Sequence, residues 1–157
     1  MSSFLFVCTG NICRSPLAEL AMRREARERG LELDIDSAAT GRWNLGEAPD
    51  PRACVIASRQ GLDASTLRSR LVTVDDFSRF DHIIALDRSH LTVLKKMQPR
   101  ASKSHLSLML DHIPTRMGQD VIDPYYGPDE GFVRTWEDVE AACAALANAT
   151  LGRRTKE

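Results

Sequence analysis

The sequence alternates along its length between short apolar runs and longer amphipathic runs. Four runs are typical of buried strands: Phe4–Val7, Leu31–Ala38, His82–Leu86 and, more weakly, Ser104–Met109. Helical patterns cover residues 16–29, 52–60, 74–80, 88–97 and a last long segment from about Pro128 or Gly131 to Leu151, and residues 111–131 are expected to be loop. The alternation predicts a three-layer α/β/α fold, in which a four-stranded parallel sheet carries helices on both faces. Ligands of such folds bind outside the carboxyl ends of the strands.

Length and composition predict one domain, residues 1–157, with enough apolar content (43%) for a proper core. The 21 basic and 22 acidic residues are mixed along the chain, so we expect no nucleic-acid partner and no membrane surface as partner. We see neither an export signal nor a membrane span, and therefore expect a cytoplasmic protein with reduced thiols. The four histidines are scattered and sit beside no cysteine pair, so we expect neither metal nor cofactor.

The segment VCTGNICRSP, Val7–Pro16, joins the first expected strand to the first expected helix. Its backbone N–H groups, together with the helix N-terminus behind it, predict an anion-binding loop. Gly10 and Asn11 support this prediction, because both residue types tolerate the left-handed backbone angles that a tight loop needs.

Cys8 lies where such a loop would favour its thiolate form, which makes it the candidate nucleophile. Arg14 is placed to donate two parallel hydrogen bonds to phosphoryl oxygens, and Ser15 to hydrogen-bond the sulfur as leaving group. The alternative is a small buried cysteine and an unrelated surface arginine, which the CxxxxxR spacing alone would favour. The position in a Gly-Asn loop between a strand and a proline-led helix favours the catalytic interpretation.

VCTGNICRSP also resembles the active-site signature of the low-molecular-weight protein tyrosine phosphatases. Further matching motifs occur in the family's order: SAAT (37–40), W..GE.PDPRA (43–53), LDRSHL (86–91) and DPYYG (123–127). The resemblance implies hydrolysis of phosphotyrosine proteins or small aryl phosphates through a phosphocysteine on Cys8. The phosphate-binding loop is then formed by Cys8, Thr9, Gly10, Asn11, Ile12, Cys13, Arg14 and Ser15.

Asp123 is the candidate general acid and base for this reaction, since a leaving phenolate needs a proton and the attacking water needs a base. An ordinary turn aspartate before proline is the alternative, and the DPYYG match favours the acid. Tyr125 and Tyr126 adjoin Asp123 and are expected to line a cleft for a planar ring. The resemblance implies that Trp43 forms the opposite wall.

Four further interpretations stay open. Related phosphatases that act on arginine carry threonine at the position of Ile12 and lack the paired tyrosines, and related arsenate reductases need cysteines near residues 80–90 that this chain lacks. A phosphate-dependent binding module would not need both nucleophile and acid. A thiol redox protein built on Cys8 and Cys13 would lack CxxC spacing and leave Arg14 unexplained.

The remaining expectations concern support for the loop. Asn11 and Ser37 are expected to hold its geometry by hydrogen bonds, and Cys13 is hypothesised to capture oxidised Cys8 as a disulfide. Asp87 is interpreted as a helix cap rather than a second acid. Ala39 departs from the family's usual glycine and Leu67 from its loop-supporting histidine. We expect a monomer, with weak self-association left open.

Overall fold

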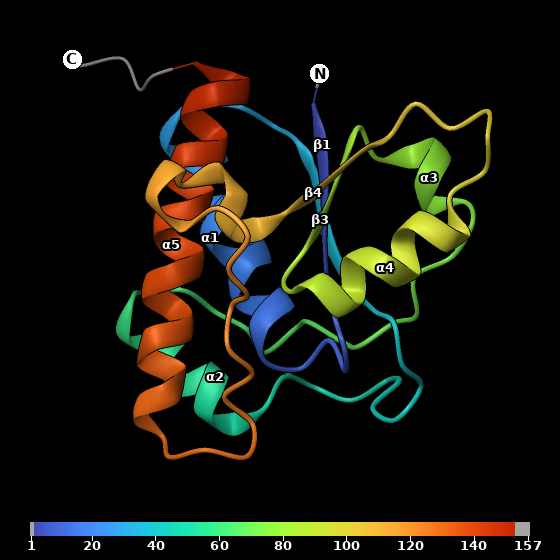
Figure 1. Cartoon of the computed structure of the whole chain (residues 1–157). Coiled ribbons are helices and arrows are strands. Elements are labelled where there is room, and N and C mark those ends of the chain that lie inside the picture. Colours follow the sequence, from blue (N-terminus) through green and yellow to red (C-terminus); the bar gives the residue numbers. More distant parts are fainter. Residues whose placement is uncertain (1, 153–157) are drawn as a thin grey trace.

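The computed structural model describes residues 2–152, so residues 1 and 153–157 of the expected domain lie outside the described residues. Four parallel strands form one sheet, as predicted (Figure 1). The strands lie in the order β2-β1-β3-β4. Their bounds are β1 Ser3–Cys8, β2 Asp34–Ala39, β3 His82–Ala85 and β4 His105–Leu108. Cys8 ends the central strand β1 and lies beside Ala39 of β2. The sheet therefore delivers Cys8 to its carboxyl edge.

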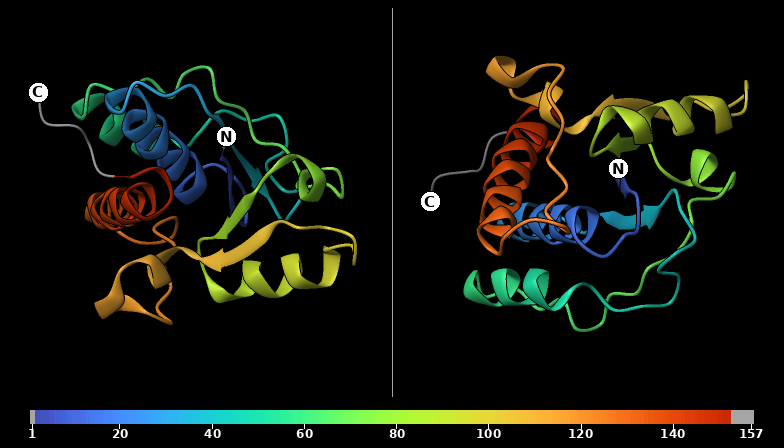
Figure 2. Two further views of the ribbon diagram at one scale, coloured as in Figure 1. Left: turned by 90° about the horizontal axis from the view of Figure 1, so that it is seen from above. Right: turned by 60° about the horizontal axis from the view of Figure 1, so that its bottom comes forward.

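Helices cover both faces of the sheet, as Figures 1 and 2 show. Helices α1, α2 and α5 lie on one side, and α3 and α4 on the other. Their bounds are α1 Arg14–Glu28, α2 Pro51–Arg59, α3 Asp76–Arg79, α4 Arg88–Met97 and α5 Glu130–Leu151, with short 3-10 turns at η1 Met109–His112 and η2 Pro114–Arg116. Within residues 2–152, no helix combines the length and apolar character needed to cross a membrane.

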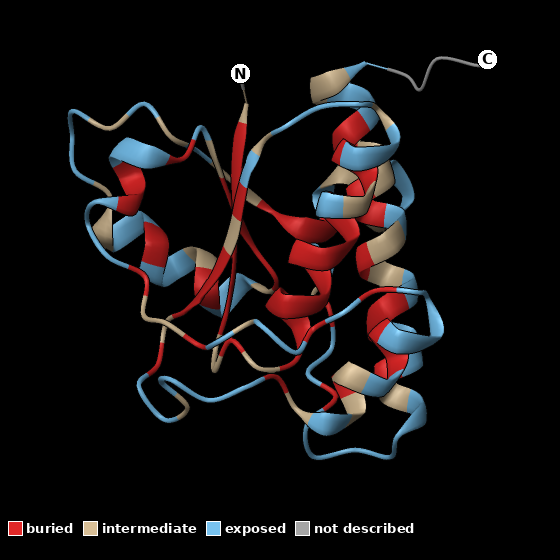
Figure 3. Cartoon of the chain, turned by 180° about the vertical axis from the view of Figure 1, so that it is seen from behind, coloured by how far each residue is buried: buried red, intermediate tan, exposed pale blue. Residues whose placement is uncertain are grey.

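Strand β1 is buried on both faces, which explains its continuous apolar run (Figure 3). Phe4 and Phe6 pack in the cluster that includes α1 and α5, whereas Leu5 and Val7 pack in the cluster that includes α3 and α4. Side chains alternate because successive residues of a strand point to opposite faces. Each such burial contributes roughly 1.5–3 kcal/mol, so the strand that carries Cys8 is firmly anchored.

Several predicted boundaries were wrong. Strand β2 begins at Asp34 rather than Leu31, because the Leu31 N–H bonds the Ala26 carbonyl (2.9 Å) and closes α1 after Gly30, whose φ is 67°. Helix α1 begins at Arg14, with Pro16 inside its first turn, so the connection after β1 is only residues 9–13. The expected loop 111–131 contains the end of η1 and all of η2, whereas α5 begins at residue 130, between the two predicted starts.

Candidate active site

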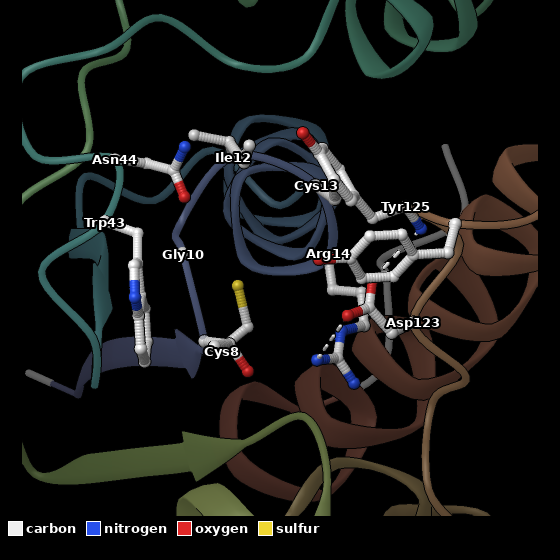
Figure 4. Close-up of a pocket in the computed structure, with 11 residues that line it drawn as sticks. Cys8, Gly10, Ile12, Cys13, Arg14, Trp43, Asn44, Asp123 and Tyr125 are labelled. Atoms are coloured by element: carbon white, nitrogen blue, oxygen red, sulfur yellow. Dashed lines mark hydrogen bonds and ion pairs between the residues drawn. The ribbon is translucent and has the colours of Figure 1, made fainter.

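A cavity of about 370 Å³ lies at the carboxyl edge of the sheet, with the sulfur of Cys8 facing into it (Figure 4). It is lined by Cys8, Thr9, Gly10, Ile12, Cys13, Arg14, Trp43, Asn44, Asp123, Tyr125 and Tyr126. Most predicted site residues therefore meet in one place. Asn11, Ser15 and Ser37 do not line the cavity, because all three are buried in the protein beneath it.

The carbonyl groups of the loop point outward, toward the surrounding protein. Four of them accept hydrogen bonds: Cys8 from the Thr40 N–H (2.9 Å), Thr9 from the Gly41 N–H (3.0 Å), Gly10 from Ser69 Oγ (2.8 Å) and Ile12 from the Asp50 N–H (2.8 Å). All described peptide bonds are trans, so the N–H of each following residue points the opposite way. The N–H groups of residues 9, 10, 11 and 13 thus turn toward the inside of the loop, as an anion site requires.

Asn11 holds the loop through its side chain and its backbone. Its φ is 57°, which confirms the predicted left-handed conformation. Its amide nitrogen donates to Ser15 Oγ (2.7 Å) and to Ser37 Oγ (2.9 Å), and its amide oxygen accepts from the Arg70 N–H (3.2 Å). These hydrogen bonds satisfy both polar atoms of the buried Asn11 amide, which stabilises this conformation.

Gly10 does not adopt the predicted left-handed backbone, because Asn11 is the residue of this loop with positive φ. Glycine fits there for a different reason. A Cβ at Gly10 would lie 2.6 Å from Asn44 Oδ1, so a larger residue would displace the Asn44 amide from its place beside the loop.

Ser15 Oγ lies 2.9 Å from Cys8 Sγ. An amide nitrogen only donates, so Ser15 Oγ accepts from Asn11 and keeps its own proton for the sulfur. The network continues from Ser37 Oγ to Glu19 Oε1 (2.7 Å), inside the fold. Burial raises the pKa of Glu19, although hydrogen bonds from Ser37 and the guanidinium of Arg23 oppose that rise. The nucleophile is thus the end of a buried polar chain.

The two departures from the family pattern have structural contexts. Leu67 is half-buried and packs against the larger hydrophobic cluster, so it offers the loop no polar contact. Ser69, two residues later, makes such a contact with the Gly10 carbonyl. Ala39 is fully buried and pairs through its backbone with Arg70 and Val72.

Arg14 is 3% exposed and is held on one side of the cavity. Its Nη1 donates to Asp87 Oδ2 (2.8 Å) and to the Val121 carbonyl (2.8 Å), whereas Nη2 lies 3.8 Å from Asp123 Oδ2 (Figure 4). The fixed guanidinium plane points the remaining N–H groups in set directions.

Asp87 caps α4, as predicted, by accepting from the backbone N–H groups of Ser89 (2.8 Å) and His90 (3.3 Å). It also binds Arg14, a contact that the sequence did not reveal. Burial alone would raise the Asp87 pKa, but hydrogen bonds from Ser89 and Arg14 outweigh it and lower the pKa to about 2. The cap is therefore a permanent charge partner of Arg14.

The segment around Asp123 reaches the cavity past the end of β3. The Val121 N–H donates to the carbonyl of Leu86 (3.0 Å), the residue after β3, and this hydrogen bond holds the segment beside the end of the strand. Asp123 Oδ1 accepts from the Tyr125 N–H (3.1 Å), and its side chain is 45% exposed. Asp123 is thus open to solvent and faces the cavity beside Arg14 (Figure 4).

Aromatic rings form opposite walls of the cavity, with Trp43 on one side and Tyr125 on the other (Figure 4). Tyr125 is 41% exposed and meets Tyr126 edge to face with ring centroids 4.8 Å apart, while Tyr126 is 92% exposed. Arg52 Nη2 donates to the Tyr125 carbonyl (3.0 Å), and the Arg52 side chain is itself paired with Asp50. The Tyr125 wall is therefore tied to α2.

Comparison with known proteins identifies the family of this chain. A family model described as low molecular weight phosphotyrosine protein phosphatase matches residues 3–157. The chain belongs to this family. A Schizosaccharomyces pombe low molecular weight phosphotyrosine protein phosphatase is 40% identical over 131 residues, covering 82% of this chain and 83% of the relative.

Solved structures of related proteins share the fold. YfkJ from Bacillus subtilis superposes with a TM-score of 0.89 at 34% identity, covering 99% of this chain and 98% of the other. DARP, a drosophila arginine phosphatase, superposes with a TM-score of 0.89 at 28% identity, covering 94% and 96%. The phosphatase fold predicted from the sequence is confirmed.

All four thiols of this phosphatase family member are free: Cys8, Cys13, Cys54 and Cys143. Burial raises the pKa of the Cys13 thiol, and the negative charge of Asp50 raises it further, so Cys13 is protonated at neutral pH. Cys143 is fully buried in α5 and Cys54 packs against the core cluster, in line with their interpretation as core residues.

Sequence reasoning missed several residues that build the site, notably Asn44, Arg52, Ser69 and the Arg14-binding role of Asp87. Arg52 lies in the motif PDPRA and Asp87 in LDRSHL, so the match of these motifs to the family could have indicated that both residues belong to the site. Among residues 2–152, no group of three or more histidine, cysteine or acidic side chains is arranged to hold a metal ion.

Proposed function

We propose that this protein hydrolyses phosphotyrosine and related aryl phosphate monoesters through a phosphocysteine on Cys8. The observation that carries the proposal is the loop geometry, in which outward carbonyls direct the opposing N–H groups around the Cys8 sulfur, with Arg14 and Asp123 at the rim. Residues 1–157 are proposed to act as one phosphatase domain, in the cytoplasm and as a monomer.

In the first step, Cys8 Sγ attacks phosphorus while the bond from phosphorus to the phenolic oxygen breaks. Loop N–H groups and the free N–H groups of Arg14 hold the equatorial oxygens, so the transition-state charge meets preorganised donors. Asp123 donates its proton to the leaving phenolate oxygen. The products of this step are a phenol and the phosphocysteine.

In the second step, Asp123 accepts a proton from water as the water oxygen attacks phosphorus. The sulfur–phosphorus bond breaks, inorganic phosphate leaves and Cys8 returns as a thiolate. Ser15, whose proton is directed at the sulfur, stabilises that leaving thiolate.

Selectivity for aryl substrates is proposed to come from the walls of the cavity. A phenyl ring fits between Trp43 and Tyr125, and its length carries the phosphoryl group to the loop. A phosphoserine side chain is shorter and lacks a ring to contact these walls. Tyr126, at the rim, is proposed to contact the surrounding part of a phosphotyrosine protein.

The test is release of para-nitrophenol from para-nitrophenyl phosphate, with chelator present and with vanadate as inhibitor. Cys8→Ser is expected to abolish turnover while phosphate still binds, and Asp123→Ala to lower kcat about 10²- to 10⁴-fold. Cys54→Ser, half-buried in α2 and outside the cavity, is the matched control and should keep wild-type turnover. Unchanged turnover in either site variant would remove that residue from its role, and loss of activity in chelator would refute a metal-independent reaction.

A second candidate is phosphoarginine hydrolysis, favoured by the likeness to the drosophila arginine phosphatase. Ile12 and the paired tyrosines argue for phosphotyrosine, since a half-buried isoleucine offers no polar contact to a guanidinium. Comparing kcat/KM for matched phosphotyrosine and phosphoarginine peptides decides between them. A higher value for phosphoarginine would select the second candidate.

Protection of the nucleophile by Cys13 remains our hypothesis. Oxidation of the Cys8 thiol by peroxide would give a sulfenic acid, which the Cys13 thiol condenses with to form a disulfide and water. Mass spectrometry after peroxide treatment checks this, and the absence of a crosslinked peptide containing both residues would refute it.

A further inference from the structure

His90 connects the N-terminal turn of α4 to the phosphate-binding loop. It is the third residue of that helix and is 1% exposed. Its Nδ1 accepts from the Asp87 backbone N–H (3.1 Å), and its Nε2 lies 2.8 Å from Thr9 Oγ1. Both ring nitrogens are therefore satisfied, one by the cap and one by the loop.

The contacts determine which nitrogen carries the proton. A backbone N–H only donates, so Nδ1 holds the lone pair and the neutral ring carries its proton on Nε2. Asp87 Oδ1 lies 3.3 Å from Nδ1, but it already accepts from the N–H groups of Ser89 and His90. Burial, with the positive charge of Arg14 also contributing, outweighs the pull of Asp87 and lowers the pKa of His90 to about 4. The neutral ring thus donates from Nε2 to Thr9.

The hydrogen bond from His90 leaves the hydroxyl proton of Thr9 free to be donated elsewhere. Its Oγ1 accepts from His90, so its hydroxyl proton is available to a different acceptor. Thr9 follows the nucleophile, lines the cavity, and has its carbonyl fixed by the Gly41 N–H. The acceptor that the cavity is built to hold is an oxyanion.

We propose that His90 is a positioning residue that orients the Thr9 hydroxyl to donate to a phosphoryl oxygen of the bound substrate. This inference rests on the proposed function and adds one side-chain donor to those of the loop and Arg14. The same turn of α4 also holds Arg14 through Asp87. One helical turn therefore positions two donors, one through a carboxylate and one through a neutral imidazole.

The experiment measures binding of inorganic phosphate by calorimetry and its inhibition constant against para-nitrophenyl phosphate. Thr9→Val, which keeps the shape and removes the hydroxyl, is expected to weaken phosphate binding about tenfold, as expected for one hydrogen bond to a charged group. His90→Leu should weaken it by a similar factor. The double variant should lose no more than the larger single loss, because both changes remove one interaction.

Rescue variants separate positioning from general destabilisation. In His90→Gln, the amide oxygen accepts from the cap N–H and the amide nitrogen donates to Thr9, so most of the lost affinity should return. Thr9→Ser should likewise recover most of the loss of Thr9→Val. His112→Leu is the matched control, since its Nε2 lies 2.8 Å from Ser107 Oγ outside the cavity, and it should not change phosphate affinity.

A phosphate affinity of Thr9→Val within twofold of wild type would overturn the proposal. It would also be overturned if the fold losses of Thr9→Val and His90→Leu multiplied in the double variant. If His90→Leu fails to fold, Thr9→Val and His90→Gln still decide the matter. Calorimetry needs no turnover, so an inactive wild-type protein refutes the proposed function, whereas unchanged affinity of Thr9→Val in an active protein refutes only the inference.

Discussion

Replacing Asp87 by asparagine isolates the charge that holds Arg14. Asparagine caps helices about as well as aspartate, so α4 keeps its N-terminal hydrogen bonds. What is lost is the negative partner of a guanidinium whose side chain is only 4% exposed, at an N···O distance of 2.8 Å. The variant therefore tests the charge of Asp87, which Ser89, Arg14 and His90 stabilise, separately from the capping geometry.

The magnitude follows from the pKa of Asp87, which falls from its ordinary 3.8 to about 2 on folding. Such a shift corresponds to about 2 kcal/mol at neutral pH. This is less than the roughly 3–5 kcal/mol for breaking a fully buried pair, as expected for a side chain that is 18% exposed. For a domain of this length, about 2 kcal/mol lowers Tm by roughly 4–8 °C.

The dependence on pH gives the sharper assay. A carboxyl whose pKa is lower in the folded state stabilises the fold above its unfolded pKa, and that contribution is lost as pH falls through the folded pKa. Urea unfolding at pH 7 should give about 2 kcal/mol between wild type and Asp87→Asn, and about half of that at pH 3. Asp120→Asn is the control, because its partner Arg88 is 71% exposed and the pair should contribute little.

Two outcomes would refute this reasoning. A difference at pH 7 no larger than that of Asp120→Asn would mean that the charge of Asp87, with its partners Ser89 and Arg14, adds no stability. A difference that stays constant down to pH 3 would mean that Asp87→Asn acts through something other than its charge.

Further predictions concern the cavity walls and pH. Gly41→Ala would place a Cβ 1.9 Å from the ring of Trp43, so the ring must move, and KM for aryl phosphates should rise several-fold while the inhibition constant of phosphate stays constant. Arg52→Gln, which removes the donor to the Tyr125 carbonyl, should raise KM in the same selective way in steady-state assays. Burial lowers the pKa of His90 from 6.5 to about 4, so its contribution to stability is complete above pH 6.5 and is lost as pH falls toward 4. As pH falls from 6.5 to 4, the urea midpoint of His90→Gln should therefore fall less than that of wild type, because glutamine does not titrate.

Local patterns predicted the fold and the left-handed residue of the loop. Strand β1 could be found because a run buried on both faces is continuously apolar, and Asn11 because few residue types adopt a positive φ. The start of β2 was misplaced because Leu31 is apolar like a strand residue but closes the end of α1 instead. Apolar character alone does not distinguish those two uses.

By itself, the sequence determined the alternation of strands and helices, the parallel sheet and the position of Cys8 at its edge, because these depend on backbone preferences and burial periodicity within short windows. Only the tertiary structure decided that Asp87 and Val121, 73 and 107 residues from Arg14, bind its guanidinium, and that His90 contacts Thr9. Such contacts depend on which strand ends become neighbours when the sheet assembles, and no short window of sequence contains that information.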